Sequence, residues 1–327
     1  MITKNTSPTT KLIGVKNRFD EEYKKDNGVF YTDPIMVRLI LQKLPISGTD
    51  IIIDPCCGTG NFLLVAKELG FSNVFGADKD SYAIEMYKEL AGLDNAVCMD
   101  TLGNSADVIL RSLSLDDKVD FVVGNPPYAP IAENVTINTD DIGFLKKVRL
   151  FGNNLFIAAL IRAFELAKEE GTISYIIPKN FLHVSSYSKF RKEILKHKTI
   201  VSIVDIGAYF KEVRGEQIII TFKNSEPQRD HRITFKKFDG KEFVFKAKVP
   251  QEFYTDEVVI FYSLEDHTIY KKLSSAYKNL GDFCKGYICR GRSRSNTAIS
   301  GKDLSAYQGD GSNVVFPGER IINGQCV

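Results

Sequence analysis

Several features that would define other classes of protein are absent from this chain. In its 327 residues, no stretch approaches the ~18–20 uninterrupted apolar residues of a membrane span. The six cysteines are scattered and form no pair of C-x-x-C units, which argues against structural zinc. Residues 1–16 are polar and rich in Thr and Lys, without the apolar core of a signal peptide. We therefore expect a cytoplasmic protein with reduced cysteines and no metal.

Net charge is also small, at only +2. A chain with this balance can bind nucleic acid if its basic residues gather on one face. Candidate segments are residues 146–149, residues 236–237 and, above all, residues 285–294. The last segment mixes Gly and Tyr with four basic side chains, which are Lys285, Arg290, Arg292 and Arg294. This composition suits a loop that follows phosphates; a solvated basic loop without a partner is the alternative.

The remaining composition, 43% hydrophobic and 26% charged, is that of an ordinary globular protein long enough for two domains. Apolar runs that indicate strands alternate with segments of helical spacing. The expected strands are residues 51–53, 73–78, 95–99, 119–124, 172–177, 200–206 and 217–222. The expected helices include residues 33–44, 62–69, 153–170 and 185–196. This alternation predicts an α/β fold with a seven-stranded, doubly wound sheet.

The segment VDFVVGNPPY, at residues 119–128, combines a buried strand with a stiff polar turn. The strand delivers Asn125 at its carboxyl end, where open α/β sheets build their sites. Proline fixes its own φ and biases the residue before it toward an extended backbone, so the turn is rigid. The Asn125 oxygen, the Pro126 carbonyl and the Tyr128 ring can hold a planar aminated ring and accept hydrogen bonds from its NH2 group. The alternative is an ordinary Pro-Pro turn.

The segment DPCCGTGNF, at residues 54–62, forms a second strand–turn–helix unit behind the run at residues 51–53. Gly58 and Gly60 let the backbone turn tightly and approach a ligand, and the helix start behind them offers unpaired N–H groups. The third glycine of a dinucleotide fingerprint is missing, and Asp54 precedes the turn. That acid would repel a pyrophosphate but suits a ligand with a positive charge and an amino group.

Two further acids follow apolar runs downstream. Asp78 lies about twenty residues after the glycines, where an acid usually receives ribose hydroxyls. Alternatively, Asp78 could cap the next helix, although Asp80 is also a candidate for that cap. Asp100 follows a third run and is placed to accept from an adenine amino group, or is simply a strand-end residue.

Taken in order, DPCCGTGNF, VFGAD and VVGNPPY resemble the motifs of the S-adenosylmethionine-dependent N6-adenine DNA methyltransferases, in the order of their gamma group. GVFYTDP, at residues 28–34, resembles that group's G-x-x-Y-T-P motif, although Asp33 stands where the family often has proline. VDIGAYF, at residues 204–210, resembles a later motif whose aromatic packs against the target base. The resemblance covers roughly residues 25–225 and implies a Rossmann-like methyltransferase sheet whose last strand is antiparallel.

The resemblance also implies the cofactor, the substrate and the site. S-adenosylmethionine would be the methyl donor, without a metal, and the acceptor would be an adenine rotated out of duplex DNA. The implied cofactor-binding residues are Tyr31, Thr32, Asp54, Cys56, Gly58, Gly60, Asp78, Asp100 and Asn125. The implied catalytic residues are Asn125, Pro126, Tyr128 and Phe210, with both aromatic rings stacking on the base. The expected DNA contacts are Lys285, Arg290, Arg292 and Arg294.

These patterns divide the chain into a flexible leader or partner-contacting arm at residues 1–24, a catalytic domain at residues 25–225 and a small α+β region at residues 226–327. Within the last region, residues 233–247 are expected to form a β-hairpin. LGDFCKG, from Leu280 onward, resembles the opening of a target-recognition domain, which usually runs much longer. We therefore expect either a truncated recognition domain or a separate recognition subunit of a restriction–modification system.

Other functions remain open at this point. Cytosine C5 methylation requires a nucleophilic cysteine, but Cys56 is already part of the cofactor turn. Methyltransferases that act on RNA bases or on a protein glutamine carry the same N-P-P-Y, because a planar amide presents the same NH2 group. A non-catalytic DNA-binding or partner-binding subunit is the third alternative, and the intact set of acids, glycines and Asn125 argues against it.

Overall fold

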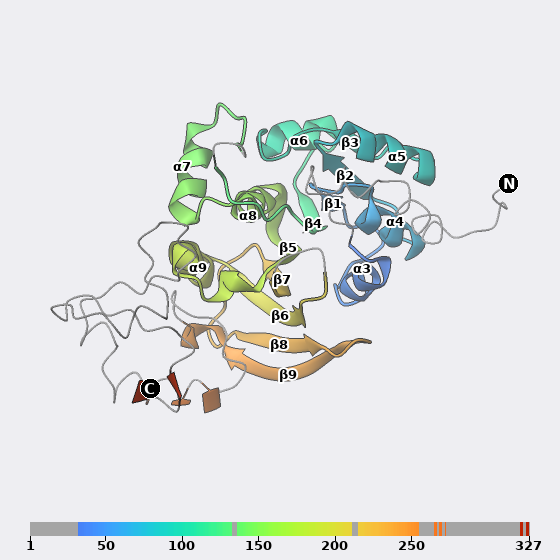
Figure 1. Ribbon diagram of the computed structural model, residues 1–327. Coiled ribbons are helices and arrows are strands. Elements are labelled where there is room, and N and C mark those ends of the chain that lie inside the picture. Colours follow the sequence, from blue (N-terminus) through green and yellow to red (C-terminus); the bar gives the residue numbers. More distant parts are fainter. Residues whose placement is uncertain are drawn as a thin grey trace, which may run out of the picture. The chain divides into compact units, whose positions relative to one another are not determined.

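The computed structural model describes residues 32–132, 136–210 and 215–254, together with residues 265, 266, 268, 269, 272, 321, 322, 325 and 326. The chain forms two compact units, Met1–His267 and Thr268–Val327. The second unit contains the short antiparallel pair β10 (Ile321–Ile322) and β11 (Gln325–Cys326). All other elements named below belong to the first unit (Figure 1).

The first unit is built on one mixed sheet with the strand order β3-β2-β1-β4-β5-β7-β6-β8-β9. Its strands are β1 (Ile52–Asp54), β2 (Val74–Asp78), β3 (Ala96–Cys98), β4 (Val119–Gly124), β5 (Ala167–Pro178), β6 (Thr199–Gly207), β7 (Gln217–Lys223), β8 (Arg232–Phe238) and β9 (Phe243–Pro250). Strands β1 to β5 are mutually parallel, and β7 lies antiparallel between β5 and β6. The expected α/β class and the antiparallel seventh strand are confirmed.

The number of strands differs from the prediction, because the sheet has nine strands and not seven. The hairpin that we assigned to a separate carboxyl-terminal region is β8–β9, and β8 pairs in parallel with β6. Ile233 and Phe235 on β8 are fully buried, and they pack in the same core as helices on one face of the sheet. Burying these side chains joins the hairpin to the sheet, so the sheet continues beyond residue 225.

Helices cover both faces of the sheet. They are α3 (Pro34–Leu41), α4 (Asn61–Glu68), α5 (Ser81–Ala91), α6 (Ala106–Ser112), α7 (Ile142–Phe151), α8 (Leu155–Leu166) and α9 (Ser188–His197), with the 3-10 turns η1 (Lys179–Leu182), η2 (Ser185–Tyr187) and η3 (Gln251–Phe253). Successive residues of one strand enter different cores, as Ile52 and Ile53 do. Helices α3 to α5 pack in one core and α6 to α9 in the other. None of the helices described is both long enough and apolar enough to cross a bilayer.

Local signals set the helix starts, whereas pairing with distant strands sets one helix end. Asp33 caps α3 by accepting from the Ile35 N–H at 2.8 Å, and Asp80 caps α5. The helix expected at residues 153–170 ends earlier, at Leu166, because Ala167 begins β5 and pairs with β4. The gain from extending the sheet outweighs the helical preference of the following residues.

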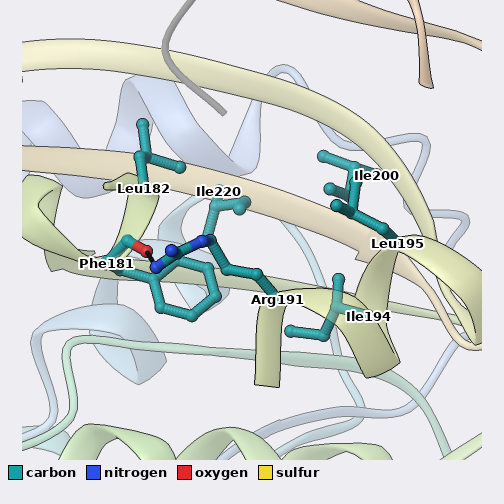
Figure 2. A pocket seen from close by; sticks show the side chains of 7 residues that line it. All are labelled: Phe181, Leu182, Arg191, Ile194, Leu195, Ile200 and Ile220. Atoms are coloured by element: carbon teal, nitrogen blue, oxygen red, sulfur yellow. Dashed lines mark hydrogen bonds between the residues drawn. The ribbon is translucent and has the colours of Figure 1, made fainter. Parts of the chain in front are cut away.

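A buried arginine holds the connection between β5 and α9. Arg191, only 1% exposed, donates a hydrogen bond from Nη1 to the Phe181 carbonyl (2.9 Å, Figure 2) and another to the Val184 carbonyl (2.7 Å). Carbonyls at the ends of short helical turns lack donors within the turn, and the Arg191 guanidinium donates the missing hydrogen bonds. A small apolar cavity beside it is lined by Ile194 and Ile220, among other side chains. Arg191 is thus accounted for as a structural residue.

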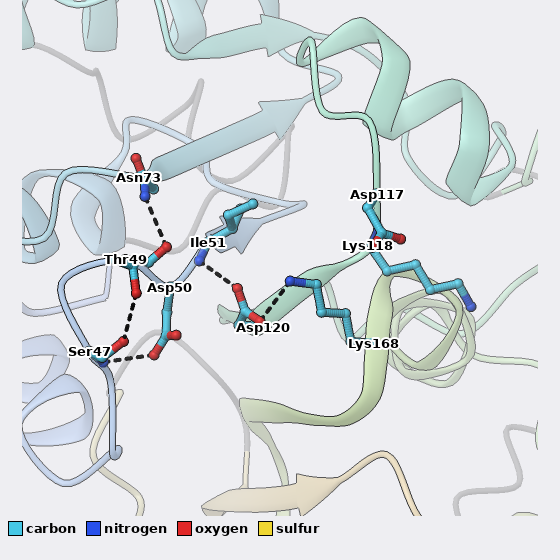
Figure 3. Close-up of polar contacts among 9 residues, drawn as sticks. All are labelled: Ser47, Thr49, Asp50, Ile51, Asn73, Asp117, Lys118, Asp120 and Lys168. Carbon is cyan, nitrogen blue, oxygen red and sulfur yellow. Dashed lines mark hydrogen bonds and ion pairs between the residues drawn. The ribbon is translucent and has the colours of Figure 1, made fainter.

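At the amino-terminal edge of the sheet, the Asp120 carboxylate on β4 contacts β5 and the residue just before β1 (Figure 3). It accepts from the Ile51 N–H at 2.8 Å and from Lys168 Nζ at 2.9 Å. Burial alone would raise its pKa, but these hydrogen bonds and the Lys168 charge outweigh burial and lower it. Asp120 therefore stabilises the edge of the sheet opposite the strand ends that carry the acids and Asn125.

We expect Asp120→Asn to lower the free energy of unfolding by about 1.5–3 kcal/mol at neutral pH, since one hydrogen bond to a charged group is lost. A carboxyl with a lowered folded-state pKa contributes stability above its unfolded pKa and loses it as pH falls through the folded pKa. The difference between the wild type and D120N should therefore be constant above about pH 5 and shrink below about pH 4. Urea unfolding across this range measures it, and a pH-independent difference would contradict the charge assignment.

Candidate active site

The side chains singled out in the sequence meet at the carboxyl edge of the parallel strands. Asp54 ends β1, Asp78 ends β2 and Asn125 follows β4 directly. Because β1 is parallel to both β2 and β4, these three ends lie along one edge. The sheet thus brings together residues that are up to 71 positions apart in the chain.

The glycine turn between β1 and α4 is tied to β2. The Gly58 N–H donates to Asp78 Oδ2 at 2.8 Å, and a Cβ placed on Gly58 would meet no atom within 4 Å. Gly60 has φ +81°, and a Cβ there would overlap the ring of Tyr87 on α5. Gly60 is therefore required by its backbone conformation and by packing, whereas the space beside Gly58 is open to a ligand.

The polar atoms of this turn fit a cationic ligand that carries an amino group. In the described part of the chain, the buried Thr59 Oγ1 and Asn61 Oδ1 have no hydrogen-bond partner. Burial, followed by the charge of Asp78, raises the pKa of Asp54 to about 8, although a hydrogen bond from the Cys56 N–H opposes this. A positive charge would stabilise the Asp54 carboxylate, and N–H donors would satisfy the two oxygens. S-adenosylmethionine has both features, so these residues fit it.

Gly124 connects this acid to the N-P-P-Y segment. Its φ is +151°, and a Cβ on it would lie 2.6 Å from Asp54 Oδ1. Only glycine allows the backbone just before Asn125 to pass this close to the buried carboxyl group. Sequence reasoning missed Gly124 as a site residue; the available signal was a glycine between a buried strand and the N-P-P-Y turn.

Both ends of the Asn125 amide are held. Its Nδ2 donates to Thr32 Oγ1 at 3.2 Å, and its Oδ1 accepts from the Tyr128 hydroxyl, which also lies 3.1 Å from the Ile176 carbonyl. Burial raises the pKa of Tyr128, so the hydroxyl stays protonated and acts as the donor. An amide oxygen has two lone pairs, so Oδ1 can still accept a second hydrogen bond. The Pro126 carbonyl has no donor among the described residues. Two acceptors are therefore available at the end of β4.

Thr32 has a different contact from the one expected. We predicted that it binds the cofactor, and that role stays a prediction; in the structure, its buried hydroxyl contacts Asn125 and its carbonyl accepts from Asn61 Nδ2. Asn61 begins α4 directly after the glycine turn. Thr32 thus connects the glycine turn to the Asn125 amide, and our sequence analysis did not identify Asn61 as a site residue.

We expect Thr32→Val to slow methyl transfer about 2- to 12-fold, since one hydrogen bond worth roughly 0.5–1.5 kcal/mol no longer orients the Asn125 amide. Thr32→Ser keeps the hydroxyl and should restore the rate. Single-turnover rates and cofactor affinity by calorimetry separate the two roles. A T32V variant that loses cofactor affinity but keeps its rate with saturating cofactor would show that Thr32 binds the cofactor instead.

The remaining expected cofactor residues lie around the same edge. Asp78 Oδ1 accepts from the Asp80 N–H at 3.0 Å, and Asp80 caps α5, which leaves Asp78 free of that role. Asp100 Oδ1 accepts from the N–H groups of Leu102 and Gly103 in the turn after β3. The proposed contacts of Asp78 with ribose and of Asp100 with adenine stay predictions.

The cysteines of the turn stay protonated. Burial, followed by the carboxylates of Asp78 and Asp54, raises the pKa of the Cys56 thiol well above its ordinary value, and burial also raises that of Cys57. Cysteine nucleophiles need a lowered pKa. The structure therefore gives no support for a cysteine nucleophile at this turn, as cytosine C5 methylation would need.

Phe210 lies inside the core of the α3–α5 face and is 6% exposed. Its ring packs edge-on against Tyr209 with 5.1 Å between the centroids, and the Tyr209 hydroxyl donates to Asp33 Oδ2 at 3.1 Å. In this arrangement the ring has almost no free face, so stacking on a base would require it to leave the core. The predicted role of Phe210 stays untested.

Other expected site residues lie outside the described residues, namely Tyr31, Lys285, Arg290, Arg292 and Arg294. The same holds for residues 1–24 and for the LGDFCKG segment that begins at Leu280. Across the described part of the chain, no group of three or more His, Cys, Asp or Glu side chains could hold a metal ion.

The comparison with known families supports the resemblance. Residues 99–210 match the family model of the Eco57I restriction-modification methylases. The type II methyltransferase M.VspI of Vibrio sp. (strain 343) is 28% identical over 220 residues, which cover 64% of this chain and 51% of that protein. The chain thus spans about half the length of this curated relative.

Solved structures share the fold. A modification subunit of a putative type I restriction enzyme from Vibrio vulnificus YJ016 aligns with a TM-score of 0.55 and 18% identity, over 85% of this chain and 60% of that chain. A putative class I S-adenosylmethionine-dependent methyltransferase from Listeria monocytogenes aligns with a TM-score of 0.53 and 20% identity, over 70% of each chain. The expected methyltransferase fold and the resemblance to restriction–modification methyltransferases are confirmed.

Proposed function

We propose that this chain, a relative of the restriction–modification methyltransferases, transfers a methyl group from S-adenosylmethionine to N6 of an adenine rotated out of duplex DNA. The observation that carries the proposal is the Asn125 amide. It is held at both ends, by Thr32 and Tyr128, and it follows directly on Gly124, which contacts the buried Asp54. A fixed acceptor beside a buried carboxyl group that suits a cationic cofactor is the arrangement that methylation of an aromatic amine requires.

The chemical difficulty is that the N6 lone pair is delocalised into the purine ring. Asn125 Oδ1 and the Pro126 carbonyl are proposed to accept the two N6–H groups, which favours a pyramidal nitrogen with a free lone pair. Both acceptors also stabilise the positive charge that grows on this nitrogen, so they bind the transition state more tightly than the ground state. The proton is released to solvent, because the methylated nitrogen is acidic, and no separate base is needed.

The cofactor end of the site has its own residues. When bound, S-adenosylmethionine supplies a methyl group on a positively charged sulfur. Asp54 and the turn around Gly58 and Gly60 are proposed to hold its methionine end, Asp78 its ribose and Asp100 its adenine. The raised pKa of Asp54 is consistent with this, since a carboxyl that is costly to ionise alone gains most from a cationic partner.

The target base must leave the duplex, which costs a few kcal/mol, because N6 cannot be reached inside it. The Tyr128 ring is proposed to recover about 1–3 kcal/mol by stacking on the extruded base. Its hydroxyl already positions Asn125, so one residue would serve both the base and the acceptor. The proposed Phe210 contact with the second face would require that ring to leave the core.

The acceptor is tested by transfer of tritium from labelled cofactor to duplex DNA, to RNA and to protein extract. We expect label in DNA, located at N6 of adenine by nucleoside chromatography. Label in RNA or in protein glutamine would identify the alternative N-P-P-Y acceptors. A chain that binds the cofactor and labels none of the three would favour a non-catalytic subunit.

The proposed partners are double-stranded DNA and a target-recognition subunit, and the proposed location is the cytoplasm. Support for a subunit comes from the structural relative that is itself a modification subunit of a putative type I restriction enzyme. Native mass measurement of the species purified from its source tests this expectation. A monomer of this chain that methylates one defined DNA sequence unaided would contradict it.

A further inference from the structure

The β8–β9 hairpin carries an excess of positive charge. Residues 236–248 hold five lysines and two acids. Lys237 on β8 and Lys241 in the turn are exposed. Neither forms an ion pair among the described residues, although Lys241 lies close enough to the exposed Asp239 for their charges to interact. Asp239 serves the turn, since it accepts from the backbone N–H groups of Lys241 and Glu242 at 2.9 Å. Five lysines against two acids therefore leave the hairpin with a net positive charge.

Protection of the sheet edge explains why two lysines of β9 are exposed, but it does not explain Lys237. Strand β9 is the edge of the sheet, and exposed lysines such as Lys246 and Lys248 discourage an edge strand from pairing with other chains. Lys237 belongs to β8, which is paired on both sides, with β6 and β9. Edge protection therefore gives no reason for its charge.

The neighbouring Lys236 shows that positive charges lie close together at this end of the sheet. Lys236 is half-buried, and burial, followed by the charge of Lys43 behind α3, lowers its pKa. Like charges held this close raise the local potential, which a bound polyanion would relieve. This points to a ligand with repeated negative charges.

The strand register places Lys237 level with the candidate active site. Lys237 pairs with Asp205 on β6, which pairs with Ile218 on β7, which pairs with Ile177 on β5. Ile177 is the residue directly after the carbonyl that the Tyr128 hydroxyl contacts. Because β8 is parallel to β6, Lys241 in the following turn lies at the same carboxyl edge of the sheet.

The distance along the sheet suits a duplex. Asn125 follows β4, and β4 and β8 are separated by three strands, hence by four spacings of about 4.8 Å, or roughly 19 Å. Duplex DNA carries one negative charge per ~1.7 Å of its axis, so a duplex that offers a base at Asn125 brings phosphates within this span. We propose that Lys237 and Lys241 bind DNA phosphates that flank the extruded base, an inference that rests on the proposed function.

The test is the salt dependence of DNA binding by the full chain. Fluorescence anisotropy with a labelled 30-base-pair duplex, from 50 to 200 mM KCl, compares the wild type with Lys237→Gln/Lys241→Gln. Each lost phosphate contact reduces the slope of log K against log salt by about 0.9. We expect the slope to fall by about 1.8 and the affinity at 100 mM salt to fall at least about tenfold.

A charge-matched control lies at the opposite edge of the sheet. Arg111, near the end of α6, and Lys118, before β4, are both exposed, and Arg111→Gln/Lys118→Gln should leave the slope unchanged (Figure 3 shows Lys118). An unchanged salt slope in K237Q/K241Q would overturn the proposal, and so would an equal fall of the slope in the control variant. It would also be overturned if K237Q/K241Q lost affinity for single-stranded RNA but not for duplex DNA. Cofactor affinity and thermal unfolding of every variant confirm that each is folded.

The outcomes separate this inference from the proposed function. A wild type that binds no duplex and labels no DNA would end both. If the wild type methylates DNA but has the same salt slope as K237Q/K241Q, the proposed function stands and only the DNA-binding role of the hairpin is ruled out.

Discussion

Asn125→Ala is expected to slow the methyl-transfer step at least about 100-fold, or ~2.7 kcal/mol, by analogy with the loss of one oxyanion-hole donor. The substitution removes the acceptor that holds the amino group of the base and stabilises its growing charge. It should disturb the fold little, because the Tyr128 hydroxyl keeps the Ile176 carbonyl as a partner. Asp54 and the glycine turn are untouched, so cofactor affinity should persist.

Single-turnover rates on unmethylated genomic DNA, with saturating cofactor, measure this effect, and calorimetry measures cofactor affinity. Asn73→Ala is the matched control, since Asn73 makes a comparable side-chain contact with the Thr49 carbonyl (3.0 Å) at the amino-terminal edge (Figure 3). It should react at the normal rate. A normal rate for N125A would end the proposed mechanism.

Asp54→Asn is expected to weaken cofactor binding at least tenfold while making the free protein more stable. The Asn oxygen can still accept from the Cys56 N–H, but the negative charge that pairs with the cofactor is lost, which costs roughly 1.5–3 kcal/mol. Since burial raises the pKa of Asp54 from 3.8 to about 8, ionising it in the folded state at neutral pH costs free energy. An amide removes that cost.

The sign of the pH dependence follows. A carboxyl whose folded pKa is raised holds its proton more tightly when folded, so its favourable contribution is complete below the unfolded pKa and declines as pH rises toward the folded pKa. Between about pH 4 and pH 8, the stability of D54N relative to the wild type should therefore increase, by up to about 4 kcal/mol at pH 7. Urea unfolding at pH 4 and pH 7 measures this change.

Asp120→Asn is the internal comparison for this result, because the pKa of Asp120 is lowered and not raised. D120N should destabilise at neutral pH, whereas D54N should stabilise, and both differences should shrink in acid. If D54N is less stable than the wild type at pH 7, Asp54 is ionised and well solvated in the free protein. The proposed role of Asp54 in holding the cofactor would then lose the support of its raised pKa.

The sequence predicted well those parts of the site that depend on neighbours in the chain. The turn after β1, the acid that ends β2 and the N-P-P-Y after β4 each join an apolar strand to a polar turn within a few residues. Helix starts at Asp33 and Asp80 followed from the same short-range logic, since a cap acts on N–H groups two or three residues away.

Long-range contacts account for what the sequence could not predict. The hydrogen bond from Asn125 to Thr32 joins residues 93 positions apart, and the approach of Gly124 to Asp54 depends on two strands pairing in register. The early end of α8 and the inclusion of the β8–β9 hairpin were also decided by pairing with distant strands. A single sequence shows apolar periodicity, but not which strands become neighbours.

By itself, then, the sequence determined the α/β class, the order of the motifs and the residue types at three strand ends, because steric and periodic rules act locally. Only the tertiary structure decided that the Asn125 amide is oriented from both ends, that Asp54 is desolvated and that Phe210 is enclosed in the core. Orientation, desolvation and enclosure depend on atoms brought together from distant parts of the chain.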